Sequence, residues 1–93
     1  MLSDIPKNLA NVGKENIDKE ILRAGMIAEL DAVSLYEQLA AMSQNKAIKT
    51  ILLDIAREEK THLAEFETLL FKNDAEQVKE TNAGRKEVEE KTG

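Results

Sequence analysis

The sequence predicts an all-α protein: an antiparallel hairpin of two long helices, followed by a short C-terminal helix, that dimerises into a four-helix bundle. Two observations carry this prediction. Apolar residues recur at intervals of three and four over residues 17–43 and again over 46–72, which is the spacing of one helical face. In addition, a two-helix hairpin within 93 residues cannot cover both of its apolar faces, so a partner is expected.

The composition narrows the functional class. The chain has no cysteine, which excludes disulfides and thiolate metal ligands. Its net charge is -5 and its basic residues are dispersed, so nucleic-acid binding is not expected. The N-terminus lacks the basic and apolar regions of a secretory signal, and no apolar run approaches the roughly 20 residues of a membrane span. We therefore expect a cytoplasmic protein without a membrane partner.

The first long helix is expected to begin after an N-terminal arm. Residues 1–15 contain the only proline, and Asn16 is the expected N-cap of a helix that runs to about Ser43. Two stripes of mostly apolar or small residues run along this helix. Together they cover more of its surface than one neighbouring helix would bury, so we expect two neighbouring helices. The first stripe is Ile21, Gly25, Ala28, Ala32, Leu35, Leu39 and Met42; the second is Leu22, Met26, Glu29, Val33, Tyr36 and Ala40.

The second long helix is expected to run antiparallel to the first. The polar residues 43–45 make a short break, and Asn45 is the expected N-cap of a helix from about Lys46 to Lys72. A charged residue on an apolar stripe must be paired or must bind something, so Glu59 and His62 are the first functional candidates. The stripe that contains them is Ile48, Leu52, Ile55, Glu59, His62, Phe66 and Leu69.

A short third helix is expected to begin at Asp74. Asp74 and Gln77 have the spacing of a capping box. The sequence Thr-Asn-Ala-Gly at 81–84 is expected to end this helix. Residues 82–93 are then a charged C-terminal tail or linker, for which a frayed helix and a disordered segment both stay open. The hairpin domain is accordingly assigned to residues 16–81.

Glu29, Glu59 and His62 are predicted to form half of a di-metal site. Glu59 and His62 lie one turn apart on one helical face, so both reach one ion. Glu29 lies 15 residues before Gln44 and Glu59 lies 15 after it, so the hairpin places them at the same height. Carboxylate and imidazole ligands suit Fe²⁺, Mn²⁺ or Zn²⁺. Di-iron carboxylate bundles use two such sets, so a second chain is expected to supply the other half.

Three further residues are weaker candidates. Tyr36 lies two turns from Glu29, about 10 Å along the axis, and is either a hydrogen-bond donor near the site or a buried tyrosine with a satisfied hydroxyl. Asp31 and Glu58 border the stripes. Both either attract incoming cations or form surface salt bridges, which is the commoner role of such carboxylates.

The segments IAELDAVSLYEQLA (27–40) and ILLDIAREEKTHLAEF (51–66) resemble the encapsulated ferritins, most closely the form fused to the encapsulin shell protein in some archaea. The resemblance covers about residues 17–80. It implies a ferritin-like four-helix unit with iron ligands at Glu29, Glu59 and His62 and a nearby tyrosine at Tyr36. Relatives often have a second acidic residue at the position of Ala28, so the resemblance leaves Asp31 to attract cations at the interface.

The resemblance also implies an activity and an assembly. Encapsulated ferritins are ferroxidases that oxidise Fe(II) with oxygen at a site holding two iron ions per homodimer. Their dimers assemble into a ring, typically a decamer, inside an encapsulin nanocompartment that stores the iron.

Two other functions remain open from the residues alone. One is a non-enzymatic helical oligomerisation module with a structural metal or no metal. The other is a rubrerythrin-like peroxidase, which is disfavoured because the chain has no cysteines for a rubredoxin-type centre.

Overall fold

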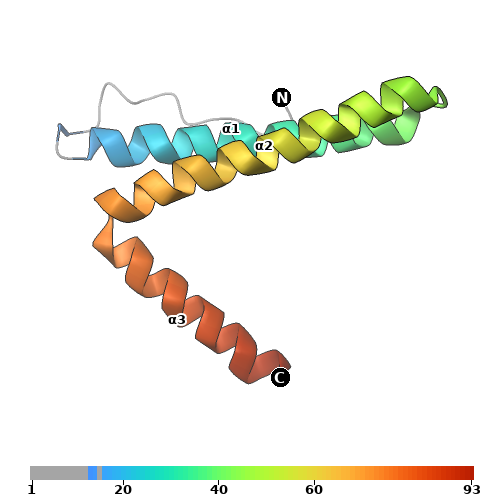
Figure 1. Cartoon of the computed structure of the whole chain (residues 1–93). Coiled ribbons are helices and arrows are strands. Elements are labelled where there is room, and N and C mark those ends of the chain that lie inside the picture. Colours follow the sequence, from blue (N-terminus) through green and yellow to red (C-terminus); the bar gives the residue numbers. More distant parts are fainter. Residues whose placement is uncertain (1–12, 15) are drawn as a thin grey trace.

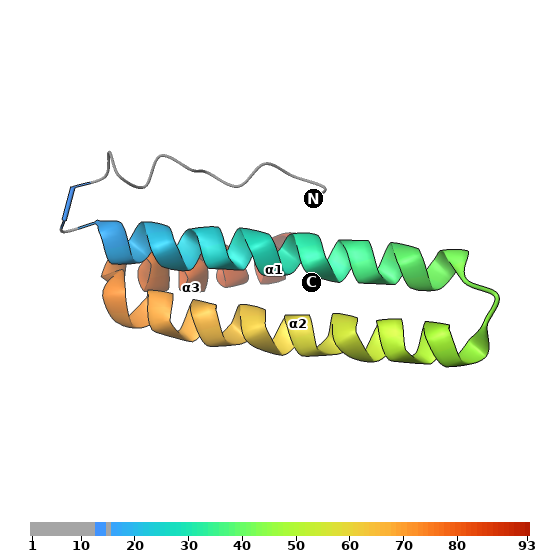
Figure 2. The same ribbon diagram turned by 90° about the horizontal axis from the view of Figure 1, so that it is seen from above.

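The computed structural model describes residues 13, 14 and 16–93, which form the helices α1 (Ile17–Met42), α2 (Lys46–Asn73) and α3 (Ala75–Thr92). Helices α1 and α2 lie side by side and antiparallel, joined by a short turn (Figure 2). Helix α3 leaves the opposite end of the hairpin and diverges from it, so that the two parts form a V (Figure 1). The predicted all-α hairpin with a C-terminal helix is confirmed. Apart from Gly13 and Lys14, the predicted N-terminal arm lies outside the described residues.

The ends of the hairpin helices agree with the capping signals. Asn45 caps α2 through its side-chain oxygen, which accepts a hydrogen bond from the Ile48 N–H at 3.1 Å. In the turn, the Ser43 hydroxyl accepts a hydrogen bond from the Asn45 N–H at 3.1 Å. Asn16 occupies the N-cap position of α1, although its side chain makes no capping hydrogen bond. The predicted helix limits therefore hold to within one residue.

The face that α2 turns toward α1 differs from the predicted stripe. The buried residues of α2 are Ala56 and Leu70, each one position after a member of the stripe. Stripe members Ile48 and Leu69 are instead 52% and 48% exposed. The physical reason is that apolar residues cover a wide arc of α2, so residues beside the stripe, as well as its members Glu59 and Phe66, pack toward α1.

On α1, the second predicted stripe packs against α2, since Leu22 and Ala40 are buried. The two ends of the first stripe stay open, since Ile21 is 49% exposed and Met42 78%, whereas Gly25, Ala28 and Ala32 in its middle are half-buried. By helical position this stripe and the predicted α2 stripe lie on one side of the hairpin, which we call the open face. A separate groove lies between the hairpin and the first turns of α3, where Gln77 and Thr81 line it together with Leu30 and Leu70. No helix within residues 17–92 is both long enough and apolar enough to cross a membrane.

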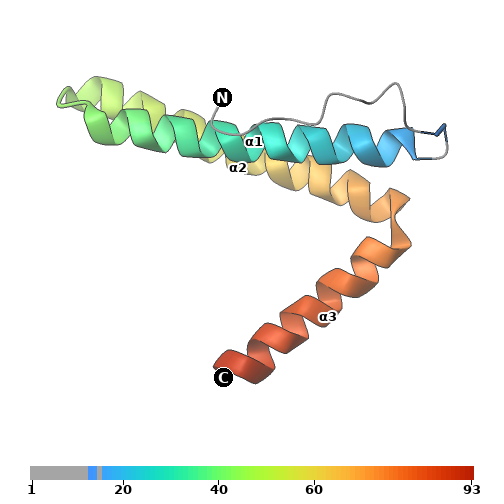
Figure 3. The ribbon, with the colours of Figure 1, turned by 180° about the vertical axis from the view of Figure 1, so that it is seen from behind.

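Helix α3 corrects the predicted break at residues 81–84. It continues without interruption through Gly84 to Thr92, as the view from behind shows (Figure 3). Gly84 does not end it because the flanking residues are strong helix formers, and Lys86 and Glu90 form an i, i+4 pair at 4.0 Å. The helix ends at Gly93, which has a φ of 75° and donates its N–H to the Glu89 carbonyl. Residues 82–92 are therefore part of α3, and the helix is the one of the open alternatives for the tail that the structure shows.

Candidate metal centre

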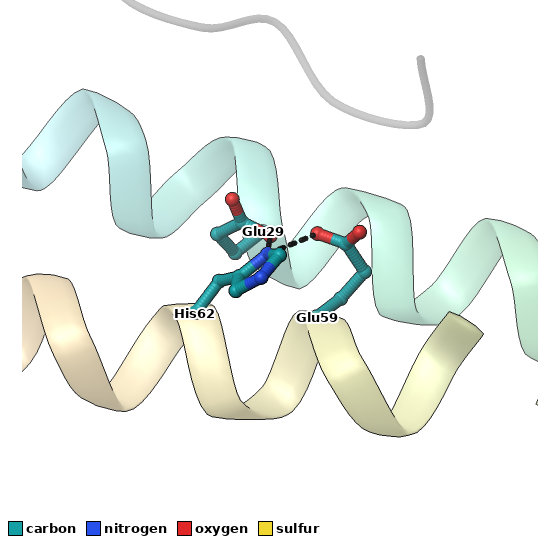
Figure 4. Close-up of side chains that lie close together, drawn as sticks. All are labelled: Glu29, Glu59 and His62. Carbon is teal, nitrogen blue, oxygen red and sulfur yellow. Dashed lines mark ion pairs between the residues drawn. The ribbon is translucent and has the colours of Figure 1, made fainter. Parts of the chain in front are cut away.

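The three predicted ligands converge where α1 and α2 face each other near their middles. Glu29 projects from α1, while Glu59 and His62 project from successive turns of α2 (Figure 4). Ligand atoms of the three side chains all lie within 4.8 Å of one another. The antiparallel register inferred from the length of the hairpin therefore brings these residues together, as the sequence predicts.

The separations are too long for strong hydrogen bonds. His62 Nδ1 lies 3.5 Å from Glu59 Oε2 and 3.7 Å from Glu29 Oε2 (Figure 4). Metal bonds of about 2.1 Å at the tetrahedral angle separate two ligand atoms by about 3.4 Å. The spacing of the three side chains thus matches donors arranged around one ion better than donors bonded to each other.

Glu29 is the most buried of the three side chains. Its side chain is 17% exposed, and its Oε2 atom is buried without a hydrogen-bond partner. Burial raises the pKa of Glu29 above its ordinary value of 4.5, and the neighbouring Glu59 carboxylate raises it further, while His62 partly opposes this. A buried carboxylate oxygen without a donor is costly, and a bound cation would remove that cost.

The donor set fits a divalent metal of the iron type. Two carboxylates and one imidazole, without thiolate, are ligands that Fe²⁺, Mn²⁺ and Zn²⁺ all accept. Three donors leave coordination positions open for a second chain, water or substrate. The His62 side chain is 46% exposed, so the ligand set is accessible to solvent on the side of His62. His62 lies at seven-residue intervals from Ile55 and Leu69, so it belongs to the open face.

The weaker candidates are not among the three side chains whose ligand atoms converge. Tyr36 is half-buried two turns along α1 and lines a shallow pocket with Ala28, Asp31, Ala32 and Leu35. Asp31 is buried, with only 8% of its surface exposed. Glu58 is 52% exposed and lies 4.0 Å from Arg57, as expected of a surface ion pair. Their roles in attracting cations or assisting the site stay predictions.

Sequence reasoning missed an ion pair that joins α1 to the start of α3. Asp74 Oδ2 accepts a hydrogen bond from Arg23 at 3.0 Å, and Asp74 Oδ1 caps α3 by accepting the Gln77 N–H at 3.0 Å. The Gln77 side chain bonds Thr81 instead of completing the predicted capping box. The cap at Asp74 could be predicted from neighbouring residues in the sequence. The bond with Arg23 could not, because Arg23 and Asp74 are 51 positions apart.

Comparison with known proteins agrees with the geometry. The family model described as rubrerythrin matches residues 20–92. The ferritin-like–encapsulin shell fusion protein of Pyrococcus furiosus is 55% identical over 74 residues, which are 80% of this chain and 21% of that protein. The chain thus spans about a fifth of this relative's length.

A solved structure also resembles the whole chain. The crystal structure of the encapsulated ferritin domain from Pyrococcus furiosus matches with a TM-score of 0.81 and 48% identity. The match covers 97% of this chain and 94% of that one. The resemblance to encapsulated ferritins that was inferred from residues 27–40 and 51–66 is therefore confirmed.

Proposed function

The chain belongs to the rubrerythrin family, and from that premise we propose that it is a ferroxidase whose di-iron site is shared across a homodimer. Ferritin-like domains of this family generally carry di-iron oxidoreductase activity. The specific oxidation of Fe(II) to Fe(III) is our proposal. The observation that carries it is the convergence of Glu29, Glu59 and His62, with a Glu29 oxygen buried and unpartnered.

The incomplete ligand set supports a site made by two chains. One hairpin offers two carboxylates and one imidazole, half of what a di-iron bundle site uses. His62 lies on the open face in line with apolar residues that are exposed in the single chain. A second copy packed on this face would cover these apolar residues and bring its own Glu29, Glu59 and His62 to the first set.

In the proposed site each residue has a separate task. The two Glu29 carboxylates would bridge two iron ions, while Glu59 and His62 of each chain would hold one ion. Bound iron would supply the redox chemistry, each Fe²⁺ losing one electron and oxygen or peroxide accepting the two electrons. Because the pKa of Glu29 is raised, its carboxyl retains a proton to higher pH in the metal-free protein, so metal competes with a proton there.

The proposed setting follows from the relatives. The Pyrococcus furiosus protein is named as a fusion of a ferritin-like part with an encapsulin shell. We propose the same association for this chain, as a cargo or as one part of a longer fusion, within an encapsulin nanocompartment of the cytoplasm. Assembly of dimers into a ring, decameric as in encapsulated ferritins, belongs to the same proposal.

Iron oxidation by the full chain tests the activity. Fe²⁺ is added to the protein under air, and formation of Fe³⁺ is followed by absorbance. The parent should oxidise Fe²⁺ well above the rate in buffer, and Glu59→Ala and His62→Ala should fall to that background rate. Glu65→Ala is the matched control, because it removes an exposed carboxylate from the same helix and should retain the parent's rate.

The same assay separates the alternatives. Equal rates in the parent and the Glu59→Ala and His62→Ala variants would exclude the ferroxidase and favour the oligomerisation module. The match to the rubrerythrin model also makes hydrogen peroxide a necessary comparison. If oxidation under nitrogen with added peroxide is fast while oxidation by dioxygen is at background, the protein is a peroxidase that uses the same ligands.

A further inference from the structure

A close contact between α1 and α2 lies one turn from the candidate ligands. A Cβ atom added to Gly25 would lie 3.1 Å from Cε2 and Cζ of the Phe66 ring and 3.2 Å from Cδ2. These separations are tighter than ordinary van der Waals contact. The ring of Phe66 therefore packs on the backbone of α1 at the one position where that helix has no side chain.

The contact has the same register as the metal cluster. Gly25 precedes Glu29 by four residues, and Phe66 follows His62 by four. Because α1 and α2 are antiparallel, the step from Glu29 back to Gly25 and the step from His62 on to Phe66 run in the same direction in space. The Gly25–Phe66 contact therefore lies about one turn, roughly 6 Å along the helix axes, from the metal cluster. A change in helix separation at Gly25 is therefore transmitted almost undiminished to Glu29 and His62, since a helix is stiff over one turn.

We infer that Gly25 and Phe66 are positioning residues, which set the separation of α1 and α2 and thereby the distance between Glu29 and the Glu59–His62 pair. This inference rests on the proposed metal site. The ligand atoms of Glu29 on α1 and His62 on α2 are 3.7 Å apart, so a shift of α1 from α2 by a few tenths of an ångström takes up much of the tolerance of about 0.5 Å that such sites allow. Neither residue touches the metal.

In Gly25→Ala, helix propensity acts on the stability of the fold, whereas the contact with Phe66 acts on the affinity for metal. Alanine is the better helix former, so propensity alone predicts a thermal midpoint at or above that of the parent. The contact with Phe66 predicts that the ligands are displaced and that metal binds more weakly. Gly84 offers a matched control, because a Cβ there has nothing within 4 Å in the middle of α3. Gly84→Ala should keep the metal affinity of the parent.

The test is a titration of the full-length, metal-free proteins with Co²⁺, whose visible absorption reports its coordination geometry. Gly25→Ala should bind Co²⁺ about tenfold more weakly than the parent and with an altered spectrum. Adding Phe66→Leu to Gly25→Ala should restore affinity and spectrum, because the smaller side chain leaves room for the new methyl group. The single variant Phe66→Leu completes the double-mutant cycle, which measures the coupling between the two positions.

Each outcome bears on a distinct claim. Equal Co²⁺ affinity in the parent and in Gly25→Ala would overturn the positioning role while leaving the metal site intact. Independent effects of Gly25→Ala and Phe66→Leu, with no rescue, would overturn the contact as the cause. A parent that binds no Co²⁺ would overturn the proposed site and this inference with it.

Discussion

At the scale of single residues, the properties of Glu29 oppose the stability of the metal-free fold. Its buried Oε2 atom has no donor in the metal-free protein, and burial together with Glu59 raises its pKa. A side chain selected only for packing would avoid both penalties. The same properties suit a ligand that bridges two cations, because a cation replaces the missing donor and compensates both carboxylates.

We predict that Glu29→Gln makes the metal-free protein more stable while abolishing metal binding. The amide removes the buried charge and donates a hydrogen bond toward Glu59, which should stabilise the fold by about 1 kcal/mol. Urea unfolding at neutral pH with chelator measures the first effect, and calorimetric titration with Zn²⁺ measures the second. Unchanged metal stoichiometry in Glu29→Gln would rule out the bridging role.

At the scale of the elements, Asp74 fixes the start of α3 against α1. Its carboxylate caps α3 through the Gln77 N–H and accepts a hydrogen bond from Arg23, which also binds Glu20 at 3.0 Å. The Gln77 N–H is the main cause that lowers the pKa of Asp74 below its ordinary value of 3.8, with Lys19 and Arg23 contributing. One buried carboxylate therefore links the start of α3 to α1.

We predict that Asp74→Asn is less stable than the parent at neutral pH. Asparagine keeps the cap but loses the charge that faces Arg23 and Lys19. Because the folded-state pKa of Asp74 is lowered, its charge stabilises the fold above pH 3.8 and this stabilisation is lost as the pH falls through the lowered value. The difference between variant and parent should therefore shrink in acid.

Chemical unfolding followed by circular dichroism, at neutral pH and below pH 3.8, provides the measurement for Asp74→Asn. Asp54→Asn is the control, since Asp54 is 51% exposed and its ion pair is with Arg57 on the same helix. It should change stability little at either pH. If Asp74→Asn and Asp54→Asn behaved alike, the Arg23–Asp74 pair would have no special role.

At the scale of the whole molecule, the described part of the chain buries few hydrophobic side chains. Among the described residues, the buried hydrophobic side chains are Leu22, Ala40, Ala56 and Leu70, two of which are alanines. Large apolar side chains remain exposed on the open face, among them Ile21, Ile48 and Leu69. Burying such surface is the main favourable term in association, so this face is where we expect the second copy.

We predict that metal and assembly are linked. A dimer on the open face would bring two Glu29 and two Glu59 carboxylates together, and their repulsion at low dielectric opposes association until two divalent cations bind. With chelator the protein should be mainly monomeric or loosely paired, and added Fe²⁺ or Mn²⁺ should shift it to dimers and rings. High salt should not replace the metal, because buried charges are poorly screened.

Size-exclusion chromatography with light scattering across a metal titration measures this linkage. Glu59→Gln/Glu29→Gln should assemble without metal, because it removes the repelling charges and keeps the apolar face. An identical mass for the parent with chelator and with excess metal would show that helix packing alone holds the oligomer.

Much of this protein follows from local signals in the sequence. The limits of α1 and α2 depend on caps and periodicity within a few residues, so they were predicted to within one position. The cluster of Glu29, Glu59 and His62 follows from equal distances to the turn, because a short turn and the constant rise of a helix leave one register. These features need no knowledge of how side chains fit across the hairpin.

Tertiary structure decided what depends on side-chain fit between distant segments. Periodicity showed that α2 has a broad apolar arc, but packing selected Ala56 and Leu70 to face α1 and left Ile48 and Leu69 on the open face. The Arg23–Asp74 pair and the Phe66 ring on Gly25 join residues 51 and 41 positions apart. No local pattern encodes such contacts, because their energies depend on shape and distance that exist only once the helices have packed.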